Sequence, residues 1–240
     1  MKTILTIARK EYELAFRSIT SYIVFVLFLV ISGVFFATTV FKVGLAEMRG
    51  VYGFMHLLCI FFVPAITMGS IAKERSNGTL ELLSTMPIRL SHVVWGKILA
   101  AFLQLKTLIA FSVVYFIMIA ILGEGIDLGA VLLGFVGLSL AGATHVAIGI
   151  FASSLPSNQV VAFIIAFVIS AFFYVLRYLL VLVPLPMVRI LQYFSFEHRL
   201  MNFMKGVLDL KDLFFFVALI VIFATLAQLN LQSKNMMQER

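Results

Sequence analysis

The stretch ITSYIVFVLFLVISGVFFATTVF, residues 19–41, contains no charged residue. A helix of that length crosses the roughly 30 Å hydrocarbon core of a bilayer, which takes about 20 apolar residues. Similar runs recur along the rest of the chain and leave only short connections between them. The runs are 51–71, 98–122, 128–153, 159–183 and 213–231. This pattern predicts an all-α integral membrane protein with six transmembrane helices.

The composition supports this prediction. Of the 240 residues, 62% are apolar and 12% are charged, against roughly 25% charged residues in a soluble domain. The mean hydropathy of +1.11 excludes soluble and disordered proteins. The net charge of +7 does not indicate nucleic-acid binding, because basic residues accumulate on the cytoplasmic side of membrane proteins whatever their function. We therefore expect a chain that contacts the lipid bilayer and no nucleic acid.

The N-terminal segment 1–18 is too polar to be a span. Its charged residues recur at helical spacing and leave an apolar face with Ile4, Ala8 and Tyr12, which is typical of an amphipathic helix lying at the membrane interface. A cleaved signal peptide is the alternative, but the following apolar run is too long for one. With the N-terminus inside, the inner segments hold ten Lys and Arg and the outer segments six. This bias favours cytoplasmic N- and C-termini.

The inner loop 72–97 is long and charged. Asn77-Gly78 predicts a turn, and a short helix over 79–86 is expected to end before Pro87. Three leucines, Leu80, Leu82 and Leu83, give this otherwise polar segment an apolar surface. That surface suits docking into the groove of a soluble partner, and resting on lipid explains it equally well.

Three stretches resemble the permeases of ABC type-2 transporters, in which the loop between spans 2 and 3 forms a coupling helix. The first, KERSNGTLELLSTMPIRLSHVVWGK (73–97), looks like the signature of the superfamily. The other two, GLSLAGATHVAIGIFASSLPSNQVVAFIIAF (137–167) and YFSFEHRLMNFMKGVLDLKDLFFF (193–216), are similar to the gliding-motility (Gld) branch in particular. The resemblance covers nearly the whole chain.

This resemblance implies a single ABC type-2 transmembrane domain over residues 1–240. Residues 1–18 would form an interfacial helix, 19–231 a six-span bundle and 232–240 a cytoplasmic tail. A re-entrant or interfacial hairpin would lie on the outer face between spans 5 and 6. It also implies contacts with an ATPase at the coupling motif and at the turn between spans 4 and 5, besides a contact of the N-terminal helix. The residues carried over to these contacts are Glu74, Arg75, Gly78, Thr79, Leu80, Glu81, Leu82, Leu83, Pro87, Pro156, Ser157 and Asn158.

The implied partners are a cytoplasmic ABC ATPase dimer, a second permease copy or a paralogue, and an accessory membrane protein with a periplasmic domain. The expected location is the bacterial inner membrane. The chain has no Walker A motif, so we expect ATP and Mg²⁺ in the partner, no cofactor here and no catalytic activity. The complex is expected to export a substrate or to transmit force to a periplasmic partner.

Ionisable residues inside spans are functional candidates because burying them in lipid is costly. Arg177 is expected near the outer end of span 5, where it could pair with Glu197 or Glu124, and His145 lies in the middle of span 4. We take Arg177, Glu197 and His145 as candidates for a pathway or outer gate. For His145, an interhelical hydrogen bond is an equal alternative. The rival functions are an ion-coupled secondary transporter and an intramembrane enzyme, but the spans contain no paired catalytic acids and no midplane acids.

Overall fold

The computed structural model describes residues 2–43, 48–79, 89–122, 126–180 and 184–238. Throughout these ranges the regular structure is helical, and six segments are long and apolar enough to cross a membrane. The helices are α1 (Lys2–Arg17), α2 (Ile19–Val43), α3 (Arg49–Thr67), α4 (Ala72–Ser76), α6 (Leu90–Ala110), α7 (Val113–Leu122), α8 (Leu128–Ser154), α9 (Gln159–Leu179), α10 (Leu185–Phe194), α11 (Phe196–Met204) and α12 (Leu210–Gln238). The predicted all-α fold with six spans is confirmed.

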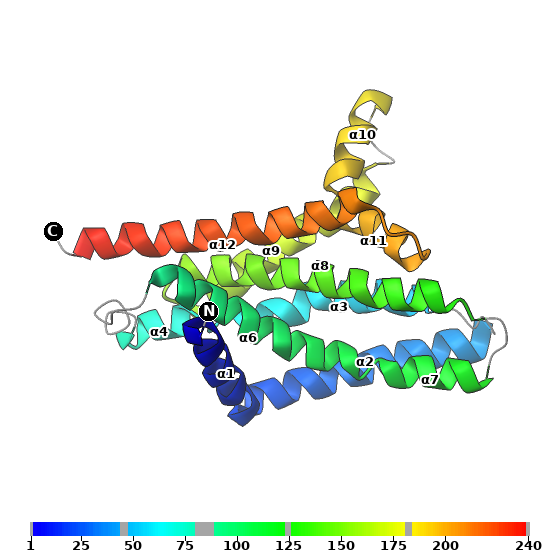
Figure 1. The fold of residues 1–240 in the computed structure, drawn as a ribbon, viewed down its shortest axis with the longest axis horizontal. Helices are drawn as coiled ribbons and strands as arrows, with labels where there is room; N and C mark the ends of the chain where they lie inside the picture. The colour runs from blue at the N-terminus through cyan, green and yellow to red at the C-terminus, as the bar shows by residue number, and fades with distance from the viewer. Residues whose placement is uncertain (1, 44–47, 80–88, 123–125, 181–183, 239–240) are drawn as a thin grey trace.

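The spans lie side by side along the long axis of the molecule (Figure 1). One end, which we call the α4 end, holds α1, α4, the start of α6 and the C-terminal part of α12. The opposite end, the hairpin end, holds α11 and the start of α8, and α10 projects away from the bundle there. This arrangement places the described part of the expected coupling motif, on α4, and the hairpin of α10 and α11 at opposite ends of the spans.

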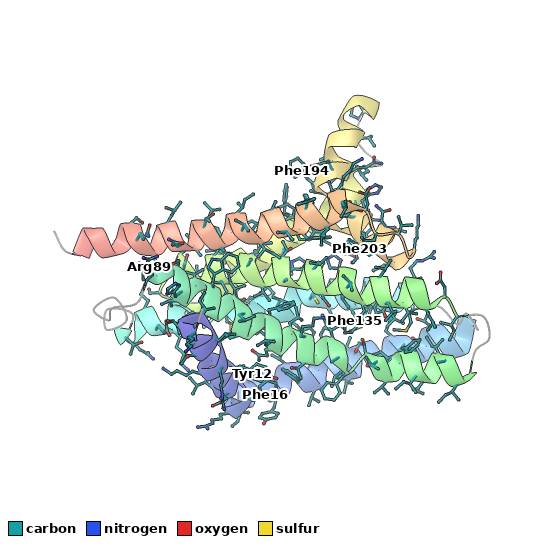
Figure 2. All side chains as sticks on the ribbon, in the orientation of Figure 1. Tyr12, Phe16, Arg89, Phe135, Phe194 and Phe203 are labelled. Carbon is teal, nitrogen blue, oxygen red and sulfur yellow. The ribbon has the colours of Figure 1, made fainter. Side chains whose placement is uncertain are left out.

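Helix α8 is the centre of the bundle and packs against α3, α6, α9, α11 and α12. In the most apolar 18-residue stretch of α8, 67% is buried inside the protein, whereas only 22% of the corresponding stretch of α9 is buried. Glycines on α8 allow this close packing: a Cβ added at Gly137 would lie 2.5 Å from the Cβ of Phe203 on α11. Figure 2 shows Phe203 beside α8. The small residues of this span therefore serve packing within the chain.

Polar side chains fix where several helices begin. Asp127 accepts hydrogen bonds from the backbone N–H groups of Gly129 and Ala130 and caps α8. Asn158 caps α9 in the same way through the N–H of Val160, and Ser195 caps α11 through the N–H of His198. Such caps satisfy N–H groups that have no partner inside the helix.

Some boundaries differ from those expected. The third span begins at Leu90 rather than residue 98, and it is divided at Phe111–Ser112 into α6 and α7. The segment 232–240, expected as a tail, continues α12 to Gln238, because it contains no glycine or proline to end a helix. Pro64 lies inside α3, one turn before the helix ends at Thr67 and the chain turns into α4. The helix expected over 79–86 lies, apart from Thr79, outside the described residues.

Candidate functional site

At the α4 end, a buried lysine joins three helices. Lys97 of α6 is 3% exposed, and its Nζ lies 2.7 Å from Oε1 of Glu74 on α4 and 3.3 Å from Oε1 of Glu11 on α1. A lysine placed two turns inside an apolar helix requires such partners, because an unpaired buried ammonium is costly. The two carboxylates thus fix α1 and α4 against the start of the third span.

Helix α1 lies across the bundle and packs on α6 through its apolar face. Ala8 is buried, and a Cβ at Gly96 would lie 2.7 Å from the side chain of Ile7, so this glycine allows the close approach. The hydroxyl of Tyr12 lies 3.0 Å from Oγ1 of Thr107; Figure 2 shows Tyr12 on this crossing helix. The predicted apolar face of the N-terminal helix is therefore the face that contacts the bundle.

Arg75 connects the two segments expected to contact an ATPase. Its Nη1 donates to the backbone carbonyls of Ser154 at 2.7 Å, Leu155 at 3.1 Å and Pro156 at 3.3 Å. These carbonyls lie at the C-terminus of α8, where a positive charge is favourable. Arg75 therefore links α4 to the α8–α9 turn through three backbone carbonyls.

Two further side chains join helices at this end: Ser153 ties the start of α4 to α8, and Asn230 ties α12 to α8. Oγ of Ser153 accepts from the N–H groups of Ile71 and Ala72 at 3.0 and 3.1 Å, and it donates to the carbonyl of Met68 at 2.9 Å. Nδ2 of Asn230 on α12 donates to the carbonyl of Ser154 at 2.7 Å. The start of α4, the end of α8 and α12 therefore form one hydrogen-bonded unit.

A cavity of about 490 Å³ opens beside this unit, between α1, α2, α3, α4 and α6. Its wall includes the ion cluster of Lys97, Glu74 and Glu11, together with apolar side chains such as Leu14 and Ile66. The ion cluster therefore borders an open cavity as well as packed side chains.

At the hairpin end, four ionisable side chains from four helices form a continuous chain. Nη1 of Arg177 on α9 lies 2.7 Å from Oε1 of Glu197 on α11. Oε2 of Glu197 lies 3.2 Å from Nδ1 of His56 on α3, and Nε2 of His56 lies 3.2 Å from Nε2 of His145 on α8. Burial raises the pKa of Glu197, but its hydrogen bond to His56 and the charge of Arg177 outweigh this, so its pKa is lowered overall.

A second polar cluster fastens the hairpin to α12. Nη1 of Arg199 lies 2.6 Å from Oδ1 of Asp212, and both side chains are almost fully buried. Asn202 donates to the other carboxylate oxygen at 2.7 Å. The guanidinium also lies over the rings of Tyr193 and Phe215, where the cation–π attraction adds to the ion pair.

A family model described as "ABC-2 family transporter protein" matches residues 44–229, which is most of the chain. The chain belongs to this family. A search of curated proteins found no match. ABC-2 permeases are generally non-catalytic membrane subunits that work with an ATPase subunit. This chain is accordingly a multi-pass membrane permease of an ABC transporter.

Several predicted coupling residues of this ABC-2 permease come together at the α4 end. Glu74 and Arg75 lie on α4, Gly78 has a φ of 69° in the turn that follows, and Thr79 donates to the carbonyl of Glu74. Pro156, Ser157 and Asn158 lie in the α8–α9 turn, which Arg75 reaches through the carbonyl of Pro156. The other predicted coupling residues lie outside the described residues: Leu80, Glu81, Leu82, Leu83 and Pro87.

The candidates for the outer gate also lie together. Arg177 pairs with Glu197, while the alternative partner Glu124 falls outside the described residues. His145 makes the interhelical hydrogen bond that we considered, and its partner is His56. Sequence reasoning did not single out His56, Glu11, Ser153 or Asn230. Their partners are 76 to 141 positions away in the chain, so no local pattern could have indicated them.

Proposed function

We propose that this ABC-2 permease couples ATP hydrolysis by a separate cytoplasmic ATPase dimer to export across the bacterial inner membrane. The α4 end would face the cytoplasm, together with both termini. The observation that carries the proposal is the connection of α1, α4, α6 and the α8–α9 turn through Lys97 and Arg75. A force applied to the coupling motif would reach three spans at once by this route.

The complete transporter would contain two permease chains, either two copies or a copy and a paralogue. ATP and Mg²⁺ would bind in the ATPase partner, because the chain has no Walker A motif. The resemblance of residues 193–216 to the gliding-motility branch supports an accessory membrane protein with a periplasmic domain. The cargo would be a hydrophobic or lipid-linked substrate, or else the complex would transmit force to that accessory protein.

The direct test is the combined variant Leu80→Asp/Leu83→Asp in the expected coupling helix. We expect the solubilised wild-type permease to recover an ATPase whose ATP hydrolysis it stimulates, and the variant to recover none. A charged surface cannot enter an apolar groove without a large desolvation cost. An intact complex with unchanged ATP hydrolysis would contradict the docking role of this segment.

A second test concerns the transmission of force through the ion cluster. Glu74→Gln with Lys97→Met should leave the ATPase bound but reduce its permease-dependent stimulation several-fold, because α4 loses its ionic link to α6. The matched control is Arg9→Gln with Glu13→Gln, an exposed pair on α1, which should change nothing. Equal loss in both variants would assign the effect to general destabilisation.

The orientation has its own test. A thiol introduced into residues 79–86, in a chain lacking Cys59, should react with a membrane-impermeant reagent only after the cells are opened. Labelling from outside intact cells would place this segment on the other side and refute the proposal. Transport driven by a proton gradient without any ATPase would instead favour a secondary transporter.

A further inference from the structure

The cavity at the α4 end extends from the amphipathic helix α1 into the depth of the bundle. Next to α1 and α4 its wall includes Lys97, and farther along the spans it includes Val24 of α2 and Gln104 of α6. Gln104 follows Lys97 by seven residues, which is about 10 Å of helix. The cavity therefore reaches from the ends of the spans into the segments that cross the membrane.

The character of the wall changes along this direction. The ionisable side chains lie on α1, on α4 and near the start of α6. Beyond them, within the spans, the wall consists mostly of small or apolar side chains: Val24, Ala65, Ile66, Ala100 and Ala101. The amide of Gln104 is the polar exception, and its Nε2 donates to Oγ of Ser21 at 3.1 Å. A wall that is charged at one end and apolar at the other matches an amphiphile better than a fully water-soluble molecule.

Two of the three lysines on the wall are free to bind a ligand. Lys97 is already engaged by Glu11 and Glu74. Lys10 on α1 and Lys73 on α4 are exposed, and their ammonium groups have no hydrogen bond or ion pair within the part of the chain that the structure describes. The three lysines outnumber the two glutamates, so the wall is net positive. Free ammonium groups on two facing helices suit an anion, and phosphate is the anion that membrane lipids supply.

The cavity is also open to its surroundings at the elbow between α1 and α2. Leu14 and Thr20 lie on its wall and are exposed, and the neighbouring Ile19 is exposed as well. In an amphipathic helix at the membrane interface, exposed apolar side chains such as Leu14 contact acyl chains. A lipid can therefore reach the cavity from the bilayer without crossing a layer of packed side chains.

We infer that this cavity binds the headgroup of one phospholipid from the leaflet at the α4 end. Lys10 and Lys73 bind its phosphate, while Leu14 and the apolar part of the wall contact the upper part of its acyl chains. The volume of about 490 Å³ lies within the range of ligand pockets, roughly 300–1,000 Å³. The bound lipid joins α1 to α4 beside the ion cluster.

A soluble phosphate compound is the other source of the same chemistry. It would engage Lys10 and Lys73 equally well, but it would leave the apolar part of the wall without a partner. A phospholipid satisfies both parts, because its phosphate and its acyl chains are joined at the depth where the wall changes from charged to apolar. The arrangement therefore favours the lipid.

The test uses the purified permease alone, stripped of lipid in a neutral detergent and titrated with dioleoylphosphatidylglycerol. Native mass spectrometry counts the bound copies, and we expect one copy to bind more tightly than all others. Lys10→Gln with Lys73→Gln should weaken this copy by about thirtyfold, and each single change by about fivefold, as expected for lysines near an anionic lipid. Both lysines are exposed, so the variants should fold as the wild type does.

The matched control is Lys2→Gln with Arg17→Gln. These residues are exposed on the same helix α1 but do not line the cavity, so the affinity of the tight copy should not change. Equal weakening would mean that the general charge of the helix holds the lipid, and it would overturn the inference. Ala65→Leu narrows the cavity without changing its charge and should also weaken the tight copy. Unchanged binding in this variant would place the lipid elsewhere.

Two further probes separate the phosphate from the acyl chains. Dioleoylglycerol has the same chains without the phosphate, and inorganic phosphate has no chains. We expect dioleoylglycerol not to occupy the site and an excess of inorganic phosphate not to displace the lipid. Equal binding of dioleoylglycerol would show a site for chains alone, and displacement by inorganic phosphate would show a site for soluble phosphate. Either result would overturn the inference. The measurement needs no ATPase, so its outcome is separate from that of the proposed function.

Discussion

The polar contacts that join helices at the two ends of the bundle differ in how far they are buried from solvent. At the α4 end, Lys97 binds two partly exposed carboxylates, and Arg75 binds carbonyls at the end of α8. A cavity of about 490 Å³ lies beside the carboxylates. At the hairpin end, Arg199 and Asp212 are almost fully buried among aromatic rings. When an ion pair beside a cavity separates, water can solvate both charges. When a fully buried ion pair separates, water cannot reach them. The α4 end is therefore suited to movement, and the base of the hairpin to rigidity.

The largest expected effect comes from breaking the buried pair at the hairpin end. Asp212→Asn leaves the guanidinium of Arg199 without its counter-charge and should destabilise the protein by about 3–5 kcal/mol. Thermal unfolding in detergent measures the loss, and the midpoint should fall by about 10 °C. Replacing both partners, with Arg199→Met and Asp212→Leu, should recover part of the loss, because no buried charge remains. If the double variant is the less stable of the two, the pair is net stabilising and the argument fails.

A smaller effect is expected at Glu197, which lies between Arg177 and His56. Because its pKa is lowered in the folded protein, its stabilising contribution is full above the ordinary glutamate value. The contribution is lost as the pH falls through the lowered value. Glu197→Gln should cost about 2 kcal/mol at neutral pH, and the curves of stability against pH should converge in acid. If the stability curves of the wild type and the variant stayed parallel at all pH values, the carboxylate charge of Glu197 would contribute nothing to stability.

The sequence predicted the helical fold far better than it predicted the ion pairs and hydrogen bonds that join the helices. Six spans follow from apolar runs, and the caps at Asp127 and Asn158 stand next to the helices they begin. By contrast, Lys97 and Glu11 are 86 positions apart, and His56 and His145 are 89 apart. Pairing at such separation depends on how the spans pack, which periodicity does not specify. Glu197, one of the two partners expected for Arg177, is the acid nearest to it along the chain, 20 positions away.

At the α4 end, Lys97→Met should have a still smaller effect on stability. The variant leaves Glu11 and Glu74 unpaired, but their side chains are 28% and 23% exposed and border the cavity, so water can solvate them. We expect a loss of about 1 kcal/mol in thermal unfolding. Lys97→Ala serves as the control for lost packing and should cost more than Lys97→Met. A loss as large as that of Asp212→Asn would remove the distinction between the two ends.

The smallest effect belongs to the exposed pair of Arg9 and Glu13 on α1, whose Nε and Oε1 lie 2.8 Å apart. Glu13 raises the pKa of Arg9 through its hydrogen bond, yet both side chains are mostly solvated, and water and salt screen such pairs. Arg9→Gln with Glu13→Gln should leave the unfolding midpoint unchanged at any salt concentration. A measurable loss that salt abolishes would mean that α1 is held on the bundle by its exposed charges, rather than by its packing on α6 and by the link from Glu11 to Lys97.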